Sequence, residues 1–122
     1  MKTFNYKNYT NCYFNVGSYV LNPKAMAISI QNDTDSEITT CTIYEKNTPY
    51  SNHLIKVKNY SENSHLTDFL EELGIVIAII DRVPCNHFVS SSIFTDNPQT
   101  IDTCIIDIDM LKKYTKNWNY NV

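Results

Sequence analysis

Hydrophobic and polar positions alternate along the first third of the chain. In residues 25–31, Met26, Ile28 and Ile30 share one side of an extended segment, which is the period of two typical of a half-buried strand. Residues 12–21 are rich in Tyr, Phe and Val, and residues 37–45 alternate again. Turn signals separate these segments, so we predict an antiparallel meander of three strands.

The period lengthens to that of a helix after residue 60. Ser61 is a favourable N-cap residue, because its hydroxyl can accept a hydrogen bond from an unpaired amide of the first turn. Gly74 stands where a residue in the left-handed conformation would end the helix. One principal helix is therefore predicted over about residues 61–73. Its apolar stripe consists of Leu66, Phe69, Leu70 and Leu73.

Further apolar runs predict additional strands and a second helix. Residues 75–80 are the most hydrophobic stretch, and their β-branched content favours a central strand buried on both faces, ended by Pro84. A short C-terminal helix, capped by Asp109, is expected over residues 110–117. The other expected strands are residues 53–58, 87–94 and 103–109.

These elements predict the α+β class, in a single domain over residues 1–122. Its mainly antiparallel β-sheet has the principal helix packed on it and is followed by the short C-terminal helix. Residues 1–10 are expected to form either a flexible lead-in or an edge segment. Residues 117–122 are expected to form either a flexible tail or one that packs Trp118.

The composition is ordinary for a soluble globular protein, with 43% hydrophobic and 19% charged residues in a chain of 122. The formal net charge of -3 gives no reason to expect direct nucleic-acid binding, since phosphates require clustered Lys and Arg. The start of the chain lacks the apolar core of a signal peptide, and the longest apolar run is too short to span a bilayer. We therefore expect a cytoplasmic protein without membrane contact.

Frequent Asn, Tyr, Ile and Lys, which have AT-rich codons, indicate a low-GC bacterial or phage genome.

The cysteines show no C-x-x-C pair, which is the usual spacing in a zinc site. We expect four buried, reduced thiols, with no metal and no other cofactor. Cys85 and His87 leave open a small enzyme with a thiol nucleophile and an imidazole base. No orienting partner or oxyanion hole can be identified beside them, so a non-enzymatic protein is the main expectation. With His53 or His65 the pair could hold a metal, but ligands so dispersed carry little signal.

Acidic and aromatic residues are the candidates for binding a protein partner. The carboxylates on the polar side of the predicted helix are Glu62, Asp68, Glu71 and Glu72. They form either a solvated helix face or a negatively charged surface complementary to a basic protein groove. A second acidic group near the C-terminus comprises Asp102, Asp107 and Asp109. The expected anchors in the late loop and the tail are Asp96, Tyr114, Trp118 and Tyr120.

The segment "VKNYSENSHLTDFLEELGIV", residues 57–76, resembles the "VKxxSENxxLxxxLxxxGIV" segment of a family of small proteins of unknown function. Members of this family are carried on plasmids, conjugative elements and phages of Firmicutes. "GSYVLNPKAMAISI" is similar to the family's early strand pair, and "HFVSSSI" to its closing strand, although His87 stands where the family usually has Gly. The resemblance covers about residues 16–95.

This resemblance implies a genomic habitat rather than a mechanism. Small acidic proteins of such elements are often counter-defence factors, of which anti-CRISPR proteins are the best known. By this analogy, we expect a protein-binding inhibitor of a bacterial defence nuclease, such as a CRISPR-associated one. The alternatives are the small Cys/His enzyme and a self-associating accessory module, such as a homodimer.

Overall fold

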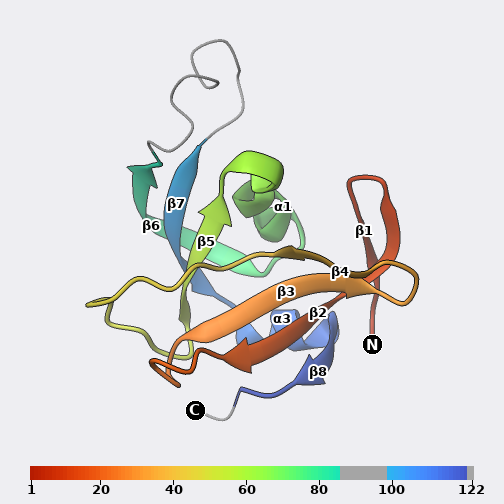
Figure 1. Ribbon diagram of the computed structural model, residues 1–122, viewed down its shortest axis with the longest axis horizontal. Coiled ribbons are helices and arrows are strands. Elements are labelled where there is room, and N and C mark those ends of the chain that lie inside the picture. The colour runs from red at the N-terminus through yellow and green to blue at the C-terminus, as the bar shows by residue number, and fades with distance from the viewer. Residues whose placement is uncertain (86–98, 121–122) are drawn as a thin grey trace.

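The computed structural model describes residues 1–85 and 99–120, and within these ranges the chain forms two β-sheets (Figure 1). The five strands of the first sheet are β1 Phe4–Tyr6, β2 Tyr9–Ser18, β3 Met26–Asn32, β4 Ser36–Thr40 and β8 Thr115–Trp118. The three strands of the second sheet are β5 Leu54–Asn59, β6 Val76–Pro84 and β7 Thr100–Ile106. The helical segments are the 3-10 turn η1 Ser61–Asn63 and the helices α1 Leu66–Glu72 and α3 Ile108–Lys113. Each of these helices is too short to act as a membrane span.

The predicted α+β class is confirmed, but the strands form two sheets where the sequence suggests one. The division arises because the third predicted strand serves both sheets. Its first part, up to Thr40, pairs with β3. Its next part pairs with β5, where the Lys58 amide donates to the Cys41 carbonyl oxygen (2.8 Å) and the Ile43 amide donates to the Lys56 carbonyl oxygen (3.0 Å). This crossing of the chain connects the two sheets.

The order and antiparallel pairing of the three N-terminal strands are as predicted, although β4 ends at Thr40 and not near residue 45. Met26, Ile28 and Ile30 are buried and alternate with half-buried residues along β3. β1 pairs with β2 at the edge of the same sheet, and its Phe4 and Tyr6 are buried in the core. The first residues therefore form an edge segment, which is one of the two expected arrangements. All strand pairs in the described ranges are antiparallel except that of β2 with β8.

The principal helix begins at Leu66, and Ser61 does not cap it. Ser61 has a φ of 58°, and it opens the 3-10 turn that precedes the helix. Asn59, the last residue of β5, takes the role expected of Ser61. Its side-chain oxygen accepts a hydrogen bond from the Thr67 amide in the first turn of α1 (3.0 Å). The capping prediction was wrong because Asn59, two residues before Ser61, satisfies the first turn.

Asn63 connects the 3-10 turn to the first sheet. Its side chain is fully buried. The Thr39 hydroxyl donates to Asn63 Oδ1, and Asn63 Nδ2 donates to the Thr40 carbonyl oxygen, both at 2.7 Å. Asn63 therefore satisfies two groups at the end of β4, which explains this position of the "SEN" motif by architecture.

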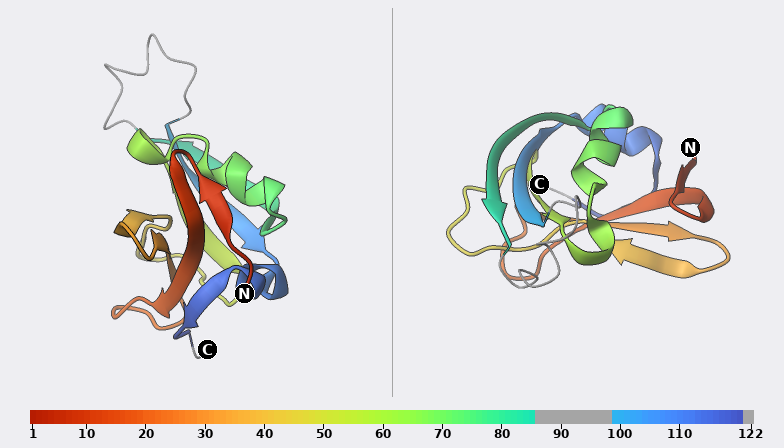
Figure 2. Two further views of the ribbon diagram at one scale, coloured as in Figure 1. Left: turned by 90° about the vertical axis from the view of Figure 1, so that its right-hand side faces the viewer. Right: turned by 90° about the horizontal axis from the view of Figure 1, so that it is seen from above.

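Packing holds α1 between β1 and the second sheet (Figure 1). Leu66 and Leu70 are buried, and the Phe69 ring lies 5.6 Å from that of Phe4 and 5.2 Å from that of Tyr6. Seen from above, β6 and β7 curve around the helix (Figure 2). At its C-terminal end Gly74 has a φ of 80°, which confirms the predicted left-handed stop.

The prediction of a central strand at residues 75–80 is wrong. β6 lies at the edge of the sheet order β5-β7-β6. Ile77 and Ile80 are the extra residues of two β-bulges against β7, and 62% and 56% of their surfaces are exposed. A bulge residue has no partner opposite it in the ladder. Ile77 and Ile80 are therefore exposed although they are hydrophobic. Pro84 ends the strand, as predicted.

Asp102 joins α1 to the second sheet. Its buried carboxylate accepts two hydrogen bonds from Arg82, from Nε at 2.8 Å and from Nη2 at 2.9 Å. The Thr67 hydroxyl donates to the same carboxylate at 2.6 Å. Burial by itself would raise the pKa of Asp102, but the hydrogen bonds from Arg82 and Thr67 outweigh it and hold the pKa below its ordinary value.

The C-terminal helix α3 is capped by Asp107 and not by Asp109. Asp107 Oδ1 accepts a hydrogen bond from the Met110 amide at 3.1 Å, so the helix begins two positions earlier than its sequence suggests. After α3, β8 runs alongside β2. Tyr120 is buried beyond it, and its hydroxyl donates to the Lys24 carbonyl oxygen at 2.8 Å.

Two substitutions distinguish the observed arrangement from a serine-capped helix. Asn63→Ala should lower the free energy of unfolding by about 2 kcal/mol, because it leaves the buried Thr39 hydroxyl and the partly buried Thr40 carbonyl oxygen without their partner. Ser61→Ala should change it by less than about 0.5 kcal/mol, whereas loss of an N-cap typically costs about 1 kcal/mol. Urea denaturation measures both. Equal destabilisation by the two variants would contradict this account of the motif.

Candidate protein-binding surfaces

The exposed side of α1 carries three carboxylates, Asp68, Glu71 and Glu72, which together form the acidic helix face. The opposite side of the helix is buried through Leu66 and Leu70, so the carboxylates are held on a fixed element. Asp68 lies 3.6 Å from His65 Nδ1. In the part of the chain that the structure describes, Glu71 and Glu72 have no ion-pair partner. Their charges are therefore available to a cationic partner.

Glu62 belongs to a different environment, although the sequence groups it with this face. It lies in η1, and its Oε1 is 3.3 Å from the Lys58 ammonium. The Lys7 ammonium donates to the Glu62 backbone carbonyl. The pKa of Glu62 is lowered by hydrogen bonds to its carboxylate from the Glu62 amide and the Ser61 hydroxyl, and by the nearby Lys58 ammonium. Nearby cations therefore partly balance the charge of Glu62.

The predicted aromatic anchors are largely used in packing. The Tyr114 ring lies 5.8 Å from the Phe4 ring. Trp118 is half-buried, with the Lys112 ammonium 4.8 Å from its ring centroid. Tyr120 is buried and holds the turn at Lys24. The remaining predicted anchor, Asp96, lies outside the described residues.

The second acidic group expected near the C-terminus does not form one surface. Asp102 is buried in its ion pair with Arg82, and Asp107 caps α3. Of the group, only Asp109 is exposed. The sequence cannot reveal that Asp102 is buried in an ion pair, because its partner Arg82 lies on another strand.

Most of the thiols are unsuited to nucleophilic chemistry. Burial raises the pKa of Cys12 and Cys41, and it raises the pKa of Cys104 to about 12, so each thiol stays protonated at neutral pH. Cys85 is buried as well. The proposed base, His87, lies outside the described residues, and the predicted strand at residues 87–94 does too. Within residues 1–85 and 99–120, no group of three or more His, Cys, Asp or Glu side chains could hold a metal ion.

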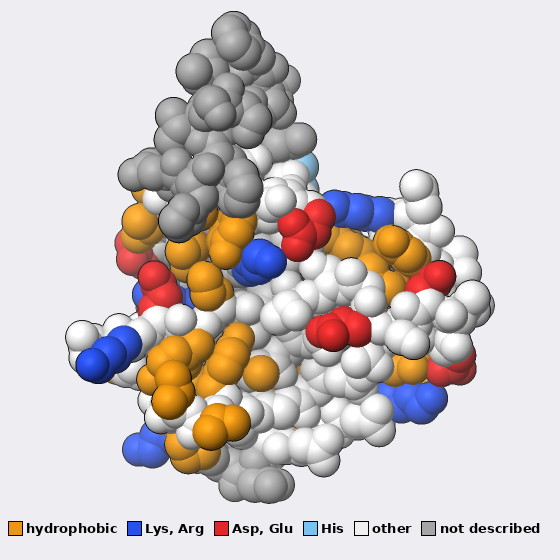
Figure 3. Space-filling view, in the orientation of Figure 1, with side chains coloured by type: hydrophobic (Ala, Val, Ile, Leu, Met, Phe, Trp, Pro, Cys, Tyr) orange, Lys and Arg blue, Asp and Glu red, His pale blue; other side chains and the backbone are white. Residues whose placement is uncertain are grey.

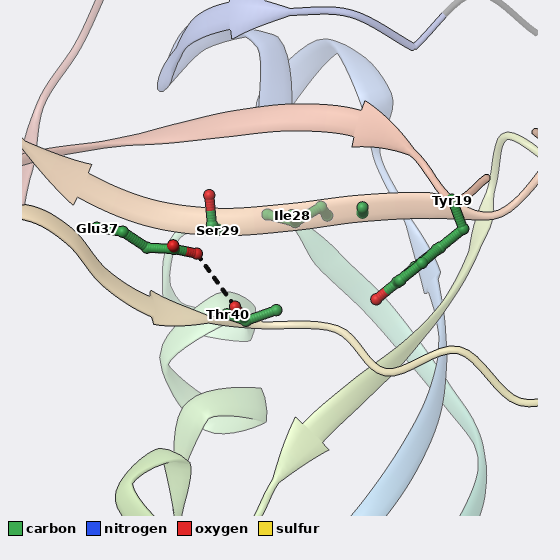
Figure 4. A pocket seen from close by; sticks show the side chains of 6 residues that line it. Tyr19, Ile28, Ser29, Glu37 and Thr40 are labelled. Atoms are coloured by element: carbon green, nitrogen blue, oxygen red, sulfur yellow. Dashed lines mark hydrogen bonds between the residues drawn. The ribbon is translucent and has the colours of Figure 1, made fainter.

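Two of the hollows in the described surface have polar lining residues that are already hydrogen-bonded. One of about 230 Å³ is lined by Tyr19, Ala27, Ile28, Ser29, Glu37 and Thr40 (Figure 4). In it the Thr40 hydroxyl donates to Glu37 (3.2 Å), and the Tyr19 hydroxyl is hydrogen-bonded to Thr42 (2.9 Å). Another, of about 410 Å³, includes Asp107, whose carboxylate already caps α3. A small-molecule site usually offers convergent polar groups that are free to fix a ligand. In the first hollow the Tyr19, Glu37 and Thr40 side chains are hydrogen-bonded within the protein.

Exposed apolar side chains form two further surfaces. The first is the β6 edge, consisting of Ile77, Ile80 and Val83, of which 62%, 56% and 48% is exposed. The second is the hairpin tip between β2 and β3, where Val20 and Leu21 are 98% and 82% exposed. Figure 3 shows hydrophobic side chains gathered over this end of the molecule, with basic side chains on either side.

The hairpin tip is held rigidly despite its exposure. The Tyr19 amide donates to the Ala25 carbonyl oxygen (3.0 Å), and the Ala25 amide donates to that of Asn22 (2.9 Å). Asn22 Oδ1 also accepts from the Lys24 amide (3.0 Å). The sequence indicates the turn at Asn22, but it does not show that the preceding aliphatic residues remain in solvent.

The β6 edge is the surface that the sequence analysis missed. One signal was present, since Asp81 and Arg82 interrupt the apolar run and Pro84 closes it. Charged residues and proline are typical of edge strands rather than central ones.

Comparisons of the chain with protein-family models, with curated proteins and with solved structures find no match.

The buried thiols generate a direct prediction. Raising the pKa of Cys104 from 9.0 to about 12 lowers its thiolate fraction at neutral pH roughly 1,000-fold. We expect iodoacetamide to alkylate Cys104 at least about 100-fold more slowly in the native protein than in urea. Peptide mass spectrometry over a time course measures the rate. Native alkylation at the unfolded rate would contradict the burial of this thiol.

Proposed function

We propose that this chain is a non-enzymatic, protein-binding inhibitor from a phage or another mobile element, and that it blocks a defence nuclease in the cytoplasm of a low-GC bacterium. The observation that carries the proposal is the acidic helix face. Glu71 and Glu72 are exposed there and have no cationic partner within the described residues. A nuclease must present clustered Lys and Arg to hold the phosphates of its substrate, and such a groove is complementary to these carboxylates.

Rigidity of the helix supports this proposal. Thr67, within α1, is bonded to Asp102 on β7 and to Asn59 on β5. The helix therefore needs no ordering when a partner binds, and a preorganised surface loses less conformational entropy on association. Exposed carboxylates on such a surface increase the rate of encounter with a basic partner and favour one orientation.

The resemblance to a family from mobile elements supports the biological setting. Several positions of the shared segment have architectural explanations: Asn63 bridges to β4, Leu66 and Leu70 fill the core, and Gly74 ends the helix. Such a segment marks a fold and a habitat. The acidic helix face lies on the same helix, directed toward solvent.

Affinity capture tests the proposal. The tagged protein should recover a nuclease or effector subunit from lysate of a related low-GC host, identified by mass spectrometry. Glu71→Lys/Glu72→Lys should weaken binding to the purified target by at least about 10-fold, mainly through a slower association rate. Binding of the unmodified protein should also weaken as salt increases.

The matched control is Glu37→Lys/Asp109→Lys, which changes the net charge equally at exposed positions outside α1. It should retain the target, and thermal melts should show both variants folded. If the target binds equally well after charge reversal at Glu71 and Glu72, the acidic helix face is not the binding surface. Recovery of the tagged protein alone would count against the proposal that this chain is a protein-binding inhibitor.

A further inference from the structure

We infer that the β6 edge is the interface of a symmetric homodimer. In this dimer β6 pairs with β6 of a second copy, antiparallel, about a two-fold axis at Ile80. This inference concerns a different surface from the acidic helix face, and it does not rest on the proposed function.

Among the described residues, the second sheet has one edge that is covered and one that is unpaired. On the β5 side, Cys41 and Ile43 bond to the outer backbone groups of Lys58 and Lys56. On the other side, β6 has no strand partner within residues 1–85 and 99–120 apart from β7. A strand with one unpaired side offers a row of amides and carbonyls to another extended chain.

The side chains along this edge favour association over solvation. Residues 76–84 contain no lysine, the residue most often used to block edge pairing. The Arg82 guanidinium is engaged by the buried Asp102 carboxylate. Asp81 is therefore the one charge on the strand without such a partner among the described residues. Ile77 and Ile80 are the extra residues of the two bulges against β7, and both are exposed.

The spacing of the apolar residues identifies the occupant as a second copy. Ile77 and Val83 stand three positions on either side of Ile80. In an antiparallel pair centred on Ile80, this residue lies opposite Ile80 of the second copy, and Ile77 lies opposite Val83. Residues directly opposite in an antiparallel pair share a face and contact one another. The order of apolar residues along β6 is therefore complementary to itself in an antiparallel pair, as a two-fold interface requires.

Charges also permit this register. Asp81 falls opposite Ile79 of the second copy, and Arg82 falls opposite Ala78. Like charges directly opposite one another would destabilise the pair, and this register places none together. The interface is small, so we expect a dissociation constant of roughly 1–100 µM. A dimer would carry two acidic helix faces and could bind a repeated partner with higher avidity.

Sedimentation velocity over concentrations up to about 1 mM tests the dimer. The unmodified protein should shift from monomer to dimer as concentration rises. Ile80→Glu should raise the dissociation constant at least about 100-fold, because it removes two isoleucines and brings two carboxylates together at the axis. The matched control, Val20→Glu, places the same charge on the hairpin tip and should leave the dimer unchanged.

Cross-linking tests the register independently of stability. Ile80→Cys should form a disulfide-linked dimer under mild oxidation, because residues at the axis face each other. Val20→Cys should not, and the native cysteines give little background because all four are buried. A strict monomer, association that survives Ile80→Glu, or association lost with Val20→Glu would each overturn the inference. Equal cross-linking of the two cysteine variants would do the same.

Discussion

The buried carboxylate of Asp102 is the interaction on which the rest of this structure depends. It joins three elements at one point: β7, which carries it, β6 through Arg82, and α1 through Thr67. A carboxylate without solvent is stable only when its oxygens are hydrogen-bonded and its charge is paired. Arg82, the only arginine in the chain, meets both requirements with a bidentate contact. The arginine is thus committed to the fold, which leaves β6 without a free cation at its edge.

Two buried asparagines complete the attachment of the helix. Asn59 satisfies the first turn of α1 from β5, and Asn63 bonds to the end of β4. Together with Asp102, they fix α1 against both sheets by polar contacts, while Leu66 and Leu70 fix it by packing. The orientation of the helix leaves its carboxylates in solvent. The proposed function therefore uses charges that the fold positions but does not need.

Local patterns predicted the parts of the fold that local physics decides. The alternation through Met26, Ile28 and Ile30 placed β3 correctly, and Gly74 marked the end of α1 because its backbone conformation is a property of that residue. The second acidic group was predicted wrongly because distant residues decide where Asp102 lies. Thr67 lies 35 residues from Asp102, and Arg82 lies 20 residues from it. In the candidate site, the carboxylates of α1 could be predicted from helical spacing. The exposed β6 edge could not, because its bulges arise from the register with β7.

The most direct test of this account is the pH dependence of unfolding for Asp102→Asn, with Asp68→Asn as the exposed control. Because the folded pKa of Asp102 is lowered, its stabilisation is present above the unfolded pKa of about 3.9 and is lost as the pH falls through the folded pKa. At pH 7, Asp102→Asn should lower the free energy of unfolding by about 2–4 kcal/mol, whereas Asp68→Asn should change it by less than about 0.5 kcal/mol. Asp102→Asn should also flatten the loss of stability that the unmodified protein shows below about pH 4. An Asp102→Asn protein as stable as the unmodified protein at pH 7, with the same loss in acid, would contradict the central place given to this carboxylate.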